Sequence, residues 1–175
     1  MSEKQLITGC LNGDRKSQKE LYDRYSRKMM GVCLRYAGDR ETARDLLQDG
    51  FIRVFTSLHT YSGTGTLEGW IRTVFVNGAL EYLRKRDVLR NSTDIENMHE
   101  IPDDEDTAVS KISAGELMEI VQALPAGFRA VFNLYALEGY SHKEIADRLH
   151  ITESTSRSQY ARARKWLQER IARYE

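Results

Sequence analysis

The sequence predicts an all-α protein, built as two small helical domains on either side of an acidic linker. Only two of its 175 residues are prolines, and no segment alternates apolar and polar residues over the length of a strand. Apolar residues instead recur every three or four positions, as in helices that pack on a core. Residues 88–106 depart from this pattern, because they lack the period and hold Pro102.

The acidic stretch sets the expected domain boundaries. A structureless segment of this length inside one compact domain would be unusual. We therefore expect a first domain over residues 1–88, an acidic linker over residues 89–106 and a second domain over residues 107–175.

The charges of the chain cancel in sum but are segregated along it. The 26 basic residues equal the 26 acidic ones, a balance that normally argues against a nucleic-acid partner. However, residues 94–106 hold seven acids and no Lys or Arg, whereas residues 155–175 hold six bases and two acids. Salt screens charges beyond about 8 Å, so the local field of each segment matters more than the total.

The cysteine content and the hydropathy of the chain indicate the cellular compartment in which the protein works. Cys10 and Cys33 are too few for a disulfide framework, and we expect Cys33 to be an ordinary core thiol on an apolar helix face. Neither a signal-peptide core nor a long apolar run is present, so we expect a cytoplasmic protein. No cofactor or metal site is expected.

Four helices are predicted in the first half of the chain. A short helix is expected over residues 3–11. A longer one is expected over residues 15–36, and Gly38 ends it. Asp39 caps a third helix. A loop over residues 59–66 follows.

Thr66 caps the fourth helix. We expect this helix to run from Leu67 to about Asp87, with a basic end. Gly78 inside it costs about 1 kcal/mol relative to alanine and would permit close packing or a local distortion.

The second half predicts a further group of helices. An amphipathic helix is expected to include Val109 and to end near Leu124, and Pro125 suits the first turn of the next, which Gly139 ends. Apolar residues of that helix, among them Phe128 and others up to position 134, should point inward.

The last fifty residues predict two helices joined by a tight turn. Ser141 and Glu144 form a capping box at the start of the first. The chain turns through His150 and Ile151, and histidine tolerates the left-handed conformation better than most residues. Thr152 caps the second run, whose basic residues are Arg157, Arg162, Arg164, Lys165, Arg170 and Arg173.

A cationic helix presented by a short helix before it fits the major groove of DNA. The plainer alternative is a solvated basic face. The capping box and the turn beside this helix favour the DNA-binding interpretation.

Two stretches of the chain together resemble a known family. The first is residues 39–86, with the segment ARDLLQDGF at residues 43–51. The second is residues 124–164, with the segment EGYS at residues 138–141. Their order, with the acidic linker between them, resembles the extracytoplasmic-function subfamily of bacterial sigma-70 initiation factors.

The resemblance implies a fold and a function. The first domain looks like the helical bundle of sigma region 2 and the second like the helix-turn-helix of region 4, with no region 3 between them. Such factors bind the clamp helices and flap of core RNA polymerase, recognise the −35 and −10 promoter elements and help to open the duplex. Many are held inactive by an anti-sigma factor, which is a further expected partner.

The resemblance also assigns residues to the −35 element. Arginine can donate two parallel bonds to guanine, worth roughly 1–3 kcal/mol of discrimination, and a helix N-terminus suits phosphates. Expected at base edges are Arg157, Ser158, Ala161 and Arg162; expected at phosphates are Ser154, Thr155, Arg164 and Lys165. Gln159 stands where relatives often have a basic residue, which weakens one phosphate contact.

Opening the −10 element requires a pocket for a base turned out of the stack, and cations for the backbone. In related factors the matching positions form such a pocket: Arg53, Ser57, Tyr61, Val74 and Asn77. Cations expected nearby are Arg72, Arg84 and Lys85. Tyr61 could be a plain loop residue and Val74 plain core, and Trp70 is expected in the core rather than as a stacking platform.

The outer face of the third helix resembles the surface that grips the polymerase clamp helices. Its residues are Asp45, Gln48 and Asp49, with Arg53 beyond them. A polar helix face is ordinarily just solvated, so this assignment depends on the resemblance. The acidic linker resembles the segment that threads toward the polymerase active-site channel, and a solvated tether is the alternative.

Rival functions fit less of the chain. An operator-binding helix-turn-helix regulator explains the second domain equally well but leaves the Asp45–Asp49 surface unexplained. An enzyme is not expected, because the four histidines are scattered and no metal, nucleophile or phosphate-loop motif is present. A helical adaptor for proteins alone conflicts with the two basic patches.

Overall fold

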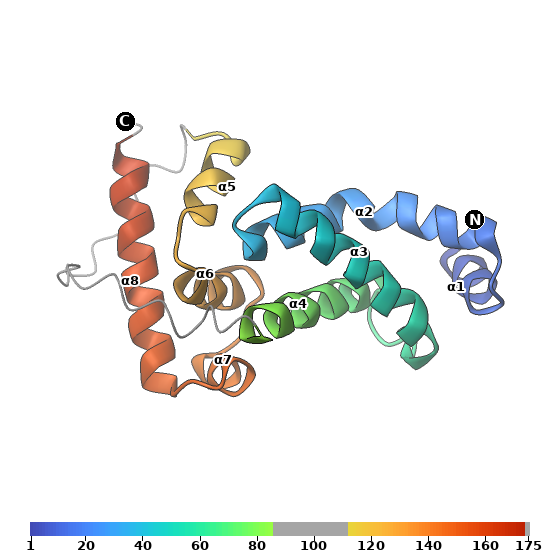
Figure 1. Cartoon of the computed structure of the whole chain (residues 1–175). Helices are drawn as coiled ribbons and strands as arrows, with labels where there is room; N and C mark the ends of the chain where they lie inside the picture. Colours follow the sequence, from blue (N-terminus) through green and yellow to red (C-terminus); the bar gives the residue numbers. More distant parts are fainter. Residues whose placement is uncertain (86–111, 174–175) are drawn as a thin grey trace. The chain divides into compact units, whose positions relative to one another are not determined.

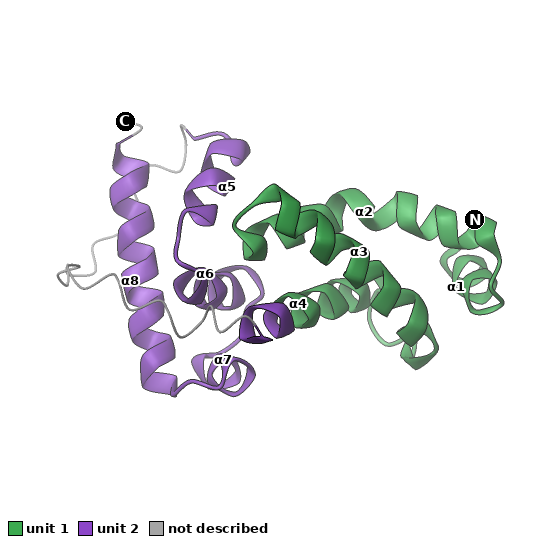
Figure 2. Cartoon of the chain, in the orientation of Figure 1, with its two compact units in different colours: residues 1–79 green, residues 80–175 purple. Residues whose placement is uncertain are grey.

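The computed structural model describes residues 1–85 and 112–173, and within these residues all regular structure is helical. The chain divides into two compact units, residues 1–79 and residues 80–175 (Figure 2). The expected linker and both expected domain boundaries, at 88 and 107, lie outside the described residues and stay predictions.

The first unit is built from the N-terminal helices. Helix α4 begins in this unit, and its last turns belong to the second (Figures 1 and 2). The elements are α1 (Glu3–Leu11), α2 (Arg15–Ala37), α3 (Arg40–Ser57), the 3₁₀ turn η1 (Leu58–Thr60) and α4 (Leu67–Lys85).

These helices begin and end where local chemistry predicts. The Asp14 carboxylate accepts a hydrogen bond from the Ser17 amide at 2.9 Å, and Asp39 accepts one from the Thr42 amide at 2.7 Å. Gly38 ends α2 in the left-handed conformation, with φ of 79°. The two carboxylates accept hydrogen bonds from amides that have no partner within their helix. The glycine adopts the left-handed conformation that ends a helix.

The core of the first unit depends on a glycine at a close contact. A methyl group placed on Gly50 of α3 would lie 2.2 Å from Cε1 of Phe75 in α4. The Phe75 ring packs edge-on against Phe51, with 5.2 Å between ring centroids. Gly50 therefore makes room for a buried aromatic ring. Gly78 is different. A methyl group placed on it would lie 3.7 Å from Arg53 Cδ, which is an ordinary van der Waals contact. Close packing therefore does not require a glycine there.

Both cysteines are free and buried. Cys33 is 2% exposed, which confirms the expected core thiol, and burial raises the pKa of Cys33 to about 12. Burial also raises the pKa of Cys10.

The second unit holds the C-terminal helices. Their bounds differ from those expected at two points. Its elements after α4 are α5 (Ala114–Gln122), α6 (Ala126–Phe132), the π-helical turn η3 (Asn133–Leu137), α7 (His142–Leu149) and α8 (Glu153–Ala172).

Helix α5 begins later than the apolar pattern predicts. Ser113 is its N-cap, in a capping box with Glu116, so Ile112 precedes the helix instead of lying within it. Val109 lies outside the described residues. The box satisfies backbone donors at Ser113 and Glu116, which is why the helix starts there.

The helix expected to run unbroken to Gly139 changes character at Asn133. The Glu138 amide donates to the Asn133 carbonyl at 3.0 Å, the five-residue spacing of a π-helix. Asn133 is fully buried, whereas Tyr135 and Leu137 are 39% and 45% exposed. The wider turn thus carries two large side chains outward.

The core of the second unit joins α8 to α5 and α6. Ala163 and Leu167 of α8 are buried in one cluster with Phe128. The buried Arg129 guanidinium donates to the carbonyls of Gln122 at 2.7 Å and Leu124 at 3.0 Å. This side chain therefore fixes the turn between α5 and α6.

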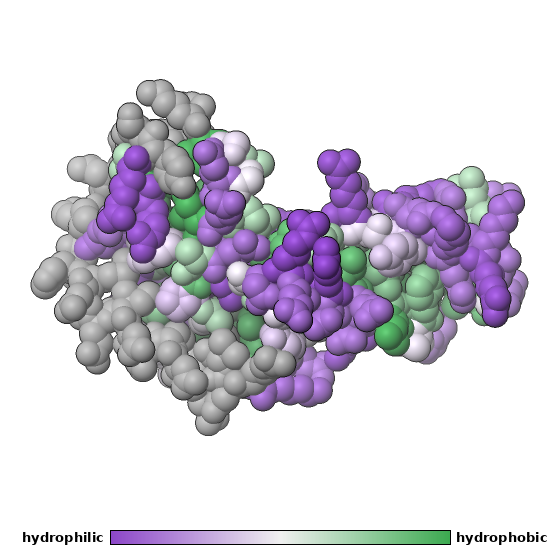
Figure 3. All heavy atoms as spheres, turned by 45° about the horizontal axis from the view of Figure 1, so that its top comes forward, coloured by the Kyte–Doolittle hydropathy of each residue, from purple (hydrophilic) through white to green (hydrophobic). Residues whose placement is uncertain are grey.

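On the face of the molecule in Figure 3, hydrophilic side chains cover most of the described surface, with hydrophobic ones between them. Among the described residues, no helix combines the length and hydropathy that a membrane crossing requires.

Candidate nucleic-acid interface

Helices α7 and α8 form a helix-turn-helix whose turn is fixed by local hydrogen bonds. The Ser141 hydroxyl accepts from the Glu144 amide at 3.2 Å, and a Glu144 carboxylate oxygen accepts from the Ser141 amide at 2.7 Å. His150 adopts the left-handed conformation, with φ of 55° and ψ of 43°. The Thr152 hydroxyl then caps α8 by accepting from the Thr155 amide at 3.0 Å. The predicted capping box, turn and second cap are all present.

The outer face of α8 presents the side chains expected at the −35 element. Arg157, Ser158, Ala161 and Arg162 are exposed, and Ala163 on the opposite face is completely buried. This division matches the helical spacing. Of the expected phosphate contacts, Ser154 and Arg164 are exposed, and Thr155 and Lys165 are half-buried.

Arg157 is not an unpartnered cation. Its Nη2 forms an ion pair with the Glu153 carboxylate one turn earlier in α8. Both side chains are about half exposed, at 63% and 46%. A solvated pair of this kind is worth only about 0.2–1 kcal/mol, so a phosphate or a base edge can displace the carboxylate.

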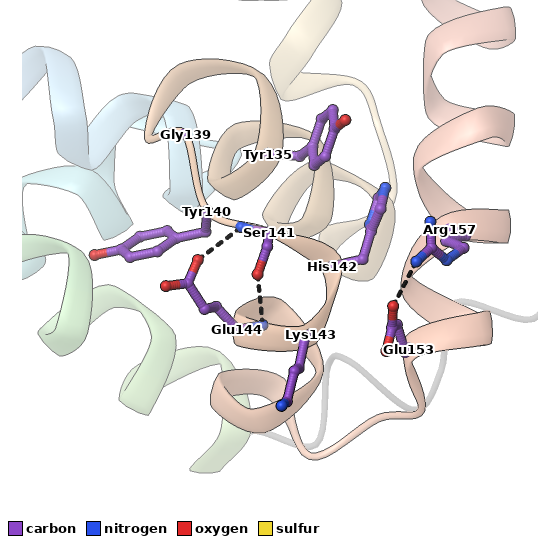
Figure 4. Close-up of a pocket in the computed structure, with 9 residues that line it drawn as sticks. All are labelled: Tyr135, Gly139, Tyr140, Ser141, His142, Lys143, Glu144, Glu153 and Arg157. Carbon is purple, nitrogen blue, oxygen red and sulfur yellow. Dashed lines mark hydrogen bonds and ion pairs between the residues drawn. The ribbon is translucent and has the colours of Figure 1, made fainter.

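An open hollow of about 640 Å³ lies beside this ion pair (Figure 4). It is bordered by the π-helical turn and by the starts of α7 and α8, with Tyr135, His142 and Arg157 among its lining residues. Lys143 at its edge adds a cation.

An aromatic group connects the helices around the hollow. The Tyr135 and His142 rings are stacked with centroids 4.3 Å apart, and Tyr135 lies 4.4 Å from the Tyr160 ring. The Nδ1 atom of His142 is 2.9 Å from the Ser156 hydroxyl, which is buried in α8. The pKa of His142 is lowered mainly by burial and, to a smaller extent, by the positive charge of the nearby Arg157 guanidinium. These contacts set the position of α8 on α7.

Sequence reasoning missed this aromatic group. Tyr135 is carried outward by the π-helical turn, which the spacing of apolar residues does not reveal. The only available signal was the abundance of ring side chains near the helix-turn-helix.

The residues expected at the −10 element lie along neighbouring parts of α3 and α4. Arg53 of α3 lies over Gly78 of α4, next to the exposed Asn77 and one turn beyond the half-buried Val74. The Ser57 hydroxyl donates to the Arg53 carbonyl at 2.6 Å. Arg53 of α3 therefore lies over the stretch of α4 that includes Val74, Asn77 and Gly78.

Tyr61 introduces the loop between η1 and α4. Its hydroxyl donates to the Gly65 carbonyl at 3.1 Å, and its ring lies 5.7 Å from the Trp70 ring. Trp70 is half-buried, so it is not enclosed in the core as expected.

The basic end of α4 already has protein partners. Arg84 Nη1 donates to the Arg148 carbonyl at 3.2 Å and lies 3.1 Å from His150 Nε2. Lys85 pairs with Glu81 at 2.8 Å, and Arg72 is half-buried on α4.

The expected polymerase-binding residues share one exposed face of α3. Asp45, Gln48 and Asp49 are exposed, and Ile52, one turn further on, is 59% exposed. Ile52 adds an apolar side chain that sequence reasoning did not assign to this face.

Within residues 1–85 and 112–173, no three His, Cys, Asp or Glu side chains converge in a way that could hold a metal ion.

Comparison with known families finds two matches in order along the chain. Residues 21–88 match the family described as "Sigma-70 region 2", and residues 114–167 match "Sigma-70, region 4". The two matches correspond to the first and second halves that the sequence separates with its acidic stretch.

Characterised relatives cover nearly the whole chain. The "ECF RNA polymerase sigma factor SigE" of Mycolicibacterium smegmatis is 31% identical over 90% of this chain, which spans 63% of that protein's length. The "ECF RNA polymerase sigma-E factor" of Haemophilus influenzae is 27% identical over 98% of this chain and 96% of its own length.

A solved structure supports the fold. The sigma factor RpoE in complex with the anti-sigma factor NepR, from Bartonella quintana, aligns with a TM-score of 0.53 at 20% identity. The alignment covers 89% of this chain and 96% of that one.

Proposed function

The chain belongs to the extracytoplasmic-function group of sigma-70 initiation factors, and we propose that its two halves divide promoter recognition between them. It joins core RNA polymerase and directs the enzyme to specific promoters. The observation that carries this function is the presence of both sigma regions, in order, on one chain.

Helix α8 reads the −35 element from the major groove. Its exposed face places Arg157 and Arg162, five residues apart, beside the small side chains of Ser158 and Ala161. Small residues let the helix approach the base edges, and the two arginines supply bidentate donors. Flanking cations and the α8 N-terminus bind phosphates.

The α3–α4 surface holds the −10 element in its opened form. Val74 and Tyr61 wall the pocket, Asn77 reads an edge of the displaced base and Arg53 neutralises the backbone. Arg72, Arg84 and Lys85 extend the cationic track, and the last two exchange their present protein partners for phosphates.

The exposed face of α3 binds the polymerase. Asp45, Gln48 and Asp49 present a polar, mostly acidic patch, and Ile52 supplies an apolar contact within it. An anti-sigma partner stays a prediction of the family resemblance.

Run-off transcription tests this function. The purified chain is mixed with core RNA polymerase and genomic fragments, and transcript 5′ ends are mapped. We expect discrete start sites that disappear without the chain. Initiation at no defined position would overturn the proposal.

The regulator alternative is not favoured, because an operator-binding protein has no use for a region 2 domain. It makes an opposite prediction, however. A palindromic footprint by the chain alone, unchanged by core polymerase, would support that alternative.

A further inference from the structure

The loop between η1 and α4 has a composition that leaves it free to move. Residues 62–66 are all exposed, and Gly63 and Gly65 have positive φ angles of 78° and 74°. Glycines in such conformations gain the most entropy when a loop is released. A loop that must capture one displaced base therefore needs restraints from outside its own sequence.

Two contacts supply these restraints, and both involve Tyr61. Its hydroxyl closes the loop by donating to the Gly65 carbonyl at 3.1 Å. Its ring packs against Trp70, with 5.7 Å between centroids and 49° between ring planes. Trp70 thereby holds the residue that ties the two ends of the loop together.

Trp70 is itself anchored firmly enough to act as a support. It lies in the first turns of α4, where its amide donates to the Thr66 carbonyl at 3.1 Å. The Thr66 hydroxyl caps the same turn through the Gly69 amide, also at 3.1 Å. The indole therefore projects from a capped helix end, and Tyr61 projects from the loop that leads into it.

The position of Trp70 along α4 connects this support to the pocket. Trp70, Val74 and Asn77 follow one another at spacings of four and three, so they lie on one face of the helix. Seven residues of helix extend about 10 Å. Tyr61 is thus held at one end of the row that Asn77 occupies at the other.

We propose that Trp70 is a positioning residue for promoter opening, which holds Tyr61 and the closed loop in the geometry that receives the displaced base. This inference rests on the proposed −10 function of the α3–α4 surface. Its energetic basis is preorganisation: a loop ordered before binding loses less entropy when the base enters.

The test uses full-length protein in holoenzyme, on a promoter selected by run-off transcription. Permanganate reactivity of unpaired thymines measures the open complex. We expect Trp70→Leu, which keeps apolar bulk without a ring, to reduce open complex about fivefold. Trp70→Phe, which restores a ring, should recover most of it. Equal loss in both variants would overturn the proposal.

A double-substitution comparison separates positioning from general stability. If Trp70 acts through Tyr61, then Trp70→Leu adds nothing to the loss of about tenfold expected for Tyr61→Ala alone. Independent, multiplied losses would contradict the inference. Polymerase binding and the thermal midpoint, measured for each variant, should stay close to those of the parent protein; a parallel loss of polymerase binding would instead indicate a structural role and also overturn it.

The same experiment distinguishes failure of the inference from failure of the proposed function. If Tyr61→Ala and Asn77→Ala both open the promoter normally, the −10 assignment is wrong. If both abolish opening while Trp70→Leu has no effect, only the role of Trp70 is wrong.

Discussion

Glu153 holds Arg157 in an ion pair along the first turns of α8. The guanidinium expected to read a base edge is therefore already occupied by a carboxylate in the free protein. On the proposed base-reading role of Arg157, DNA would have to displace this carboxylate, whose negative charge also repels phosphates. Arg162, one turn and a half further along, is exposed, and no ion pair joins it to another described residue, so the proposed contact of Arg162 with DNA would not require such a pair to break.

Neutralising Glu153 should strengthen binding to DNA. We expect Glu153→Gln to raise affinity for a −35 duplex by a factor of roughly 1.4 to 5, which corresponds to the 0.2–1 kcal/mol of an exposed ion pair. Fluorescence anisotropy at two salt concentrations measures the change. Glu169→Gln removes the same charge from an exposed position late in α8, and it serves as the control with a smaller expected effect.

Replacing the guanidinium group of Arg157 should reduce promoter selectivity. Arg157→Lys keeps the charge but loses the bidentate geometry, so discrimination should fall by roughly 1–3 kcal/mol while polymerase binding persists. Competition between the native −35 sequence and single-base variants measures it. Unchanged discrimination would remove Arg157 from base reading.

Reversing the charge at Asp49 should weaken binding to core polymerase. The residue is exposed on the polar face of α3, so Asp49→Lys should leave the fold and −35 binding intact. A pull-down with purified core polymerase measures the effect. Asp23→Lys, an equal reversal at an exposed position of α2, should retain binding; equal retention by both variants would contradict the assignment.

Gly50 and Gly31 should respond to alanine in opposite directions. An added methyl at Gly50 would overlap the Phe75 ring, so Gly50→Ala should cost roughly 1–3 kcal/mol of unfolding free energy. At Gly31 in α2, an added methyl would meet no heavy atom within 4 Å outside its chain neighbours and the adjacent backbone of its own helix, and Gly31→Ala should gain up to about 1 kcal/mol. Urea denaturation compares the two, and a gain at both sites would disprove the contact.

Stability should fall in mildly acidic solution because of His142. Folding lowers the pKa of this ring below its ordinary 6.5, so the unfolded chain takes up a proton at a higher pH than the folded one. The free energy of unfolding therefore decreases as pH falls from about 7.5 to 5.5. His142→Phe keeps a ring beside Tyr135 but cannot be protonated, and its urea midpoint should depend less on pH in this range.

The helix ends were predictable because capping chemistry is local. Asp14, Asp39, Ser141 and Thr152 each bond to an amide two or three residues away, a relationship that the sequence displays directly. The left-handed His150 was predictable for the same reason, since a turn must follow α7.

Features that depend on tertiary packing were harder to predict. The π-helical turn at Asn133 shifts the hydrogen bonds by one residue, which leaves no trace in the spacing of apolar side chains. The group of Tyr135, His142 and Tyr160 assembles residues from three elements. Trp70 looked like core because tryptophan is mostly apolar, yet its place beside an exposed loop leaves part of the ring in solvent.

A histidine in the turn before α8 limits how that helix can be aimed. Glycine at this position would open several backbone geometries at similar energy, and α8 could then leave the turn in more than one heading. At positive φ, His150 has only the narrow left-handed region of backbone angles available. Substitutions on the outer face of α8 should therefore remove contacts without changing the direction of the helix. Binding losses measured there will therefore report the cost of removing a side chain and not a change in the direction of the helix.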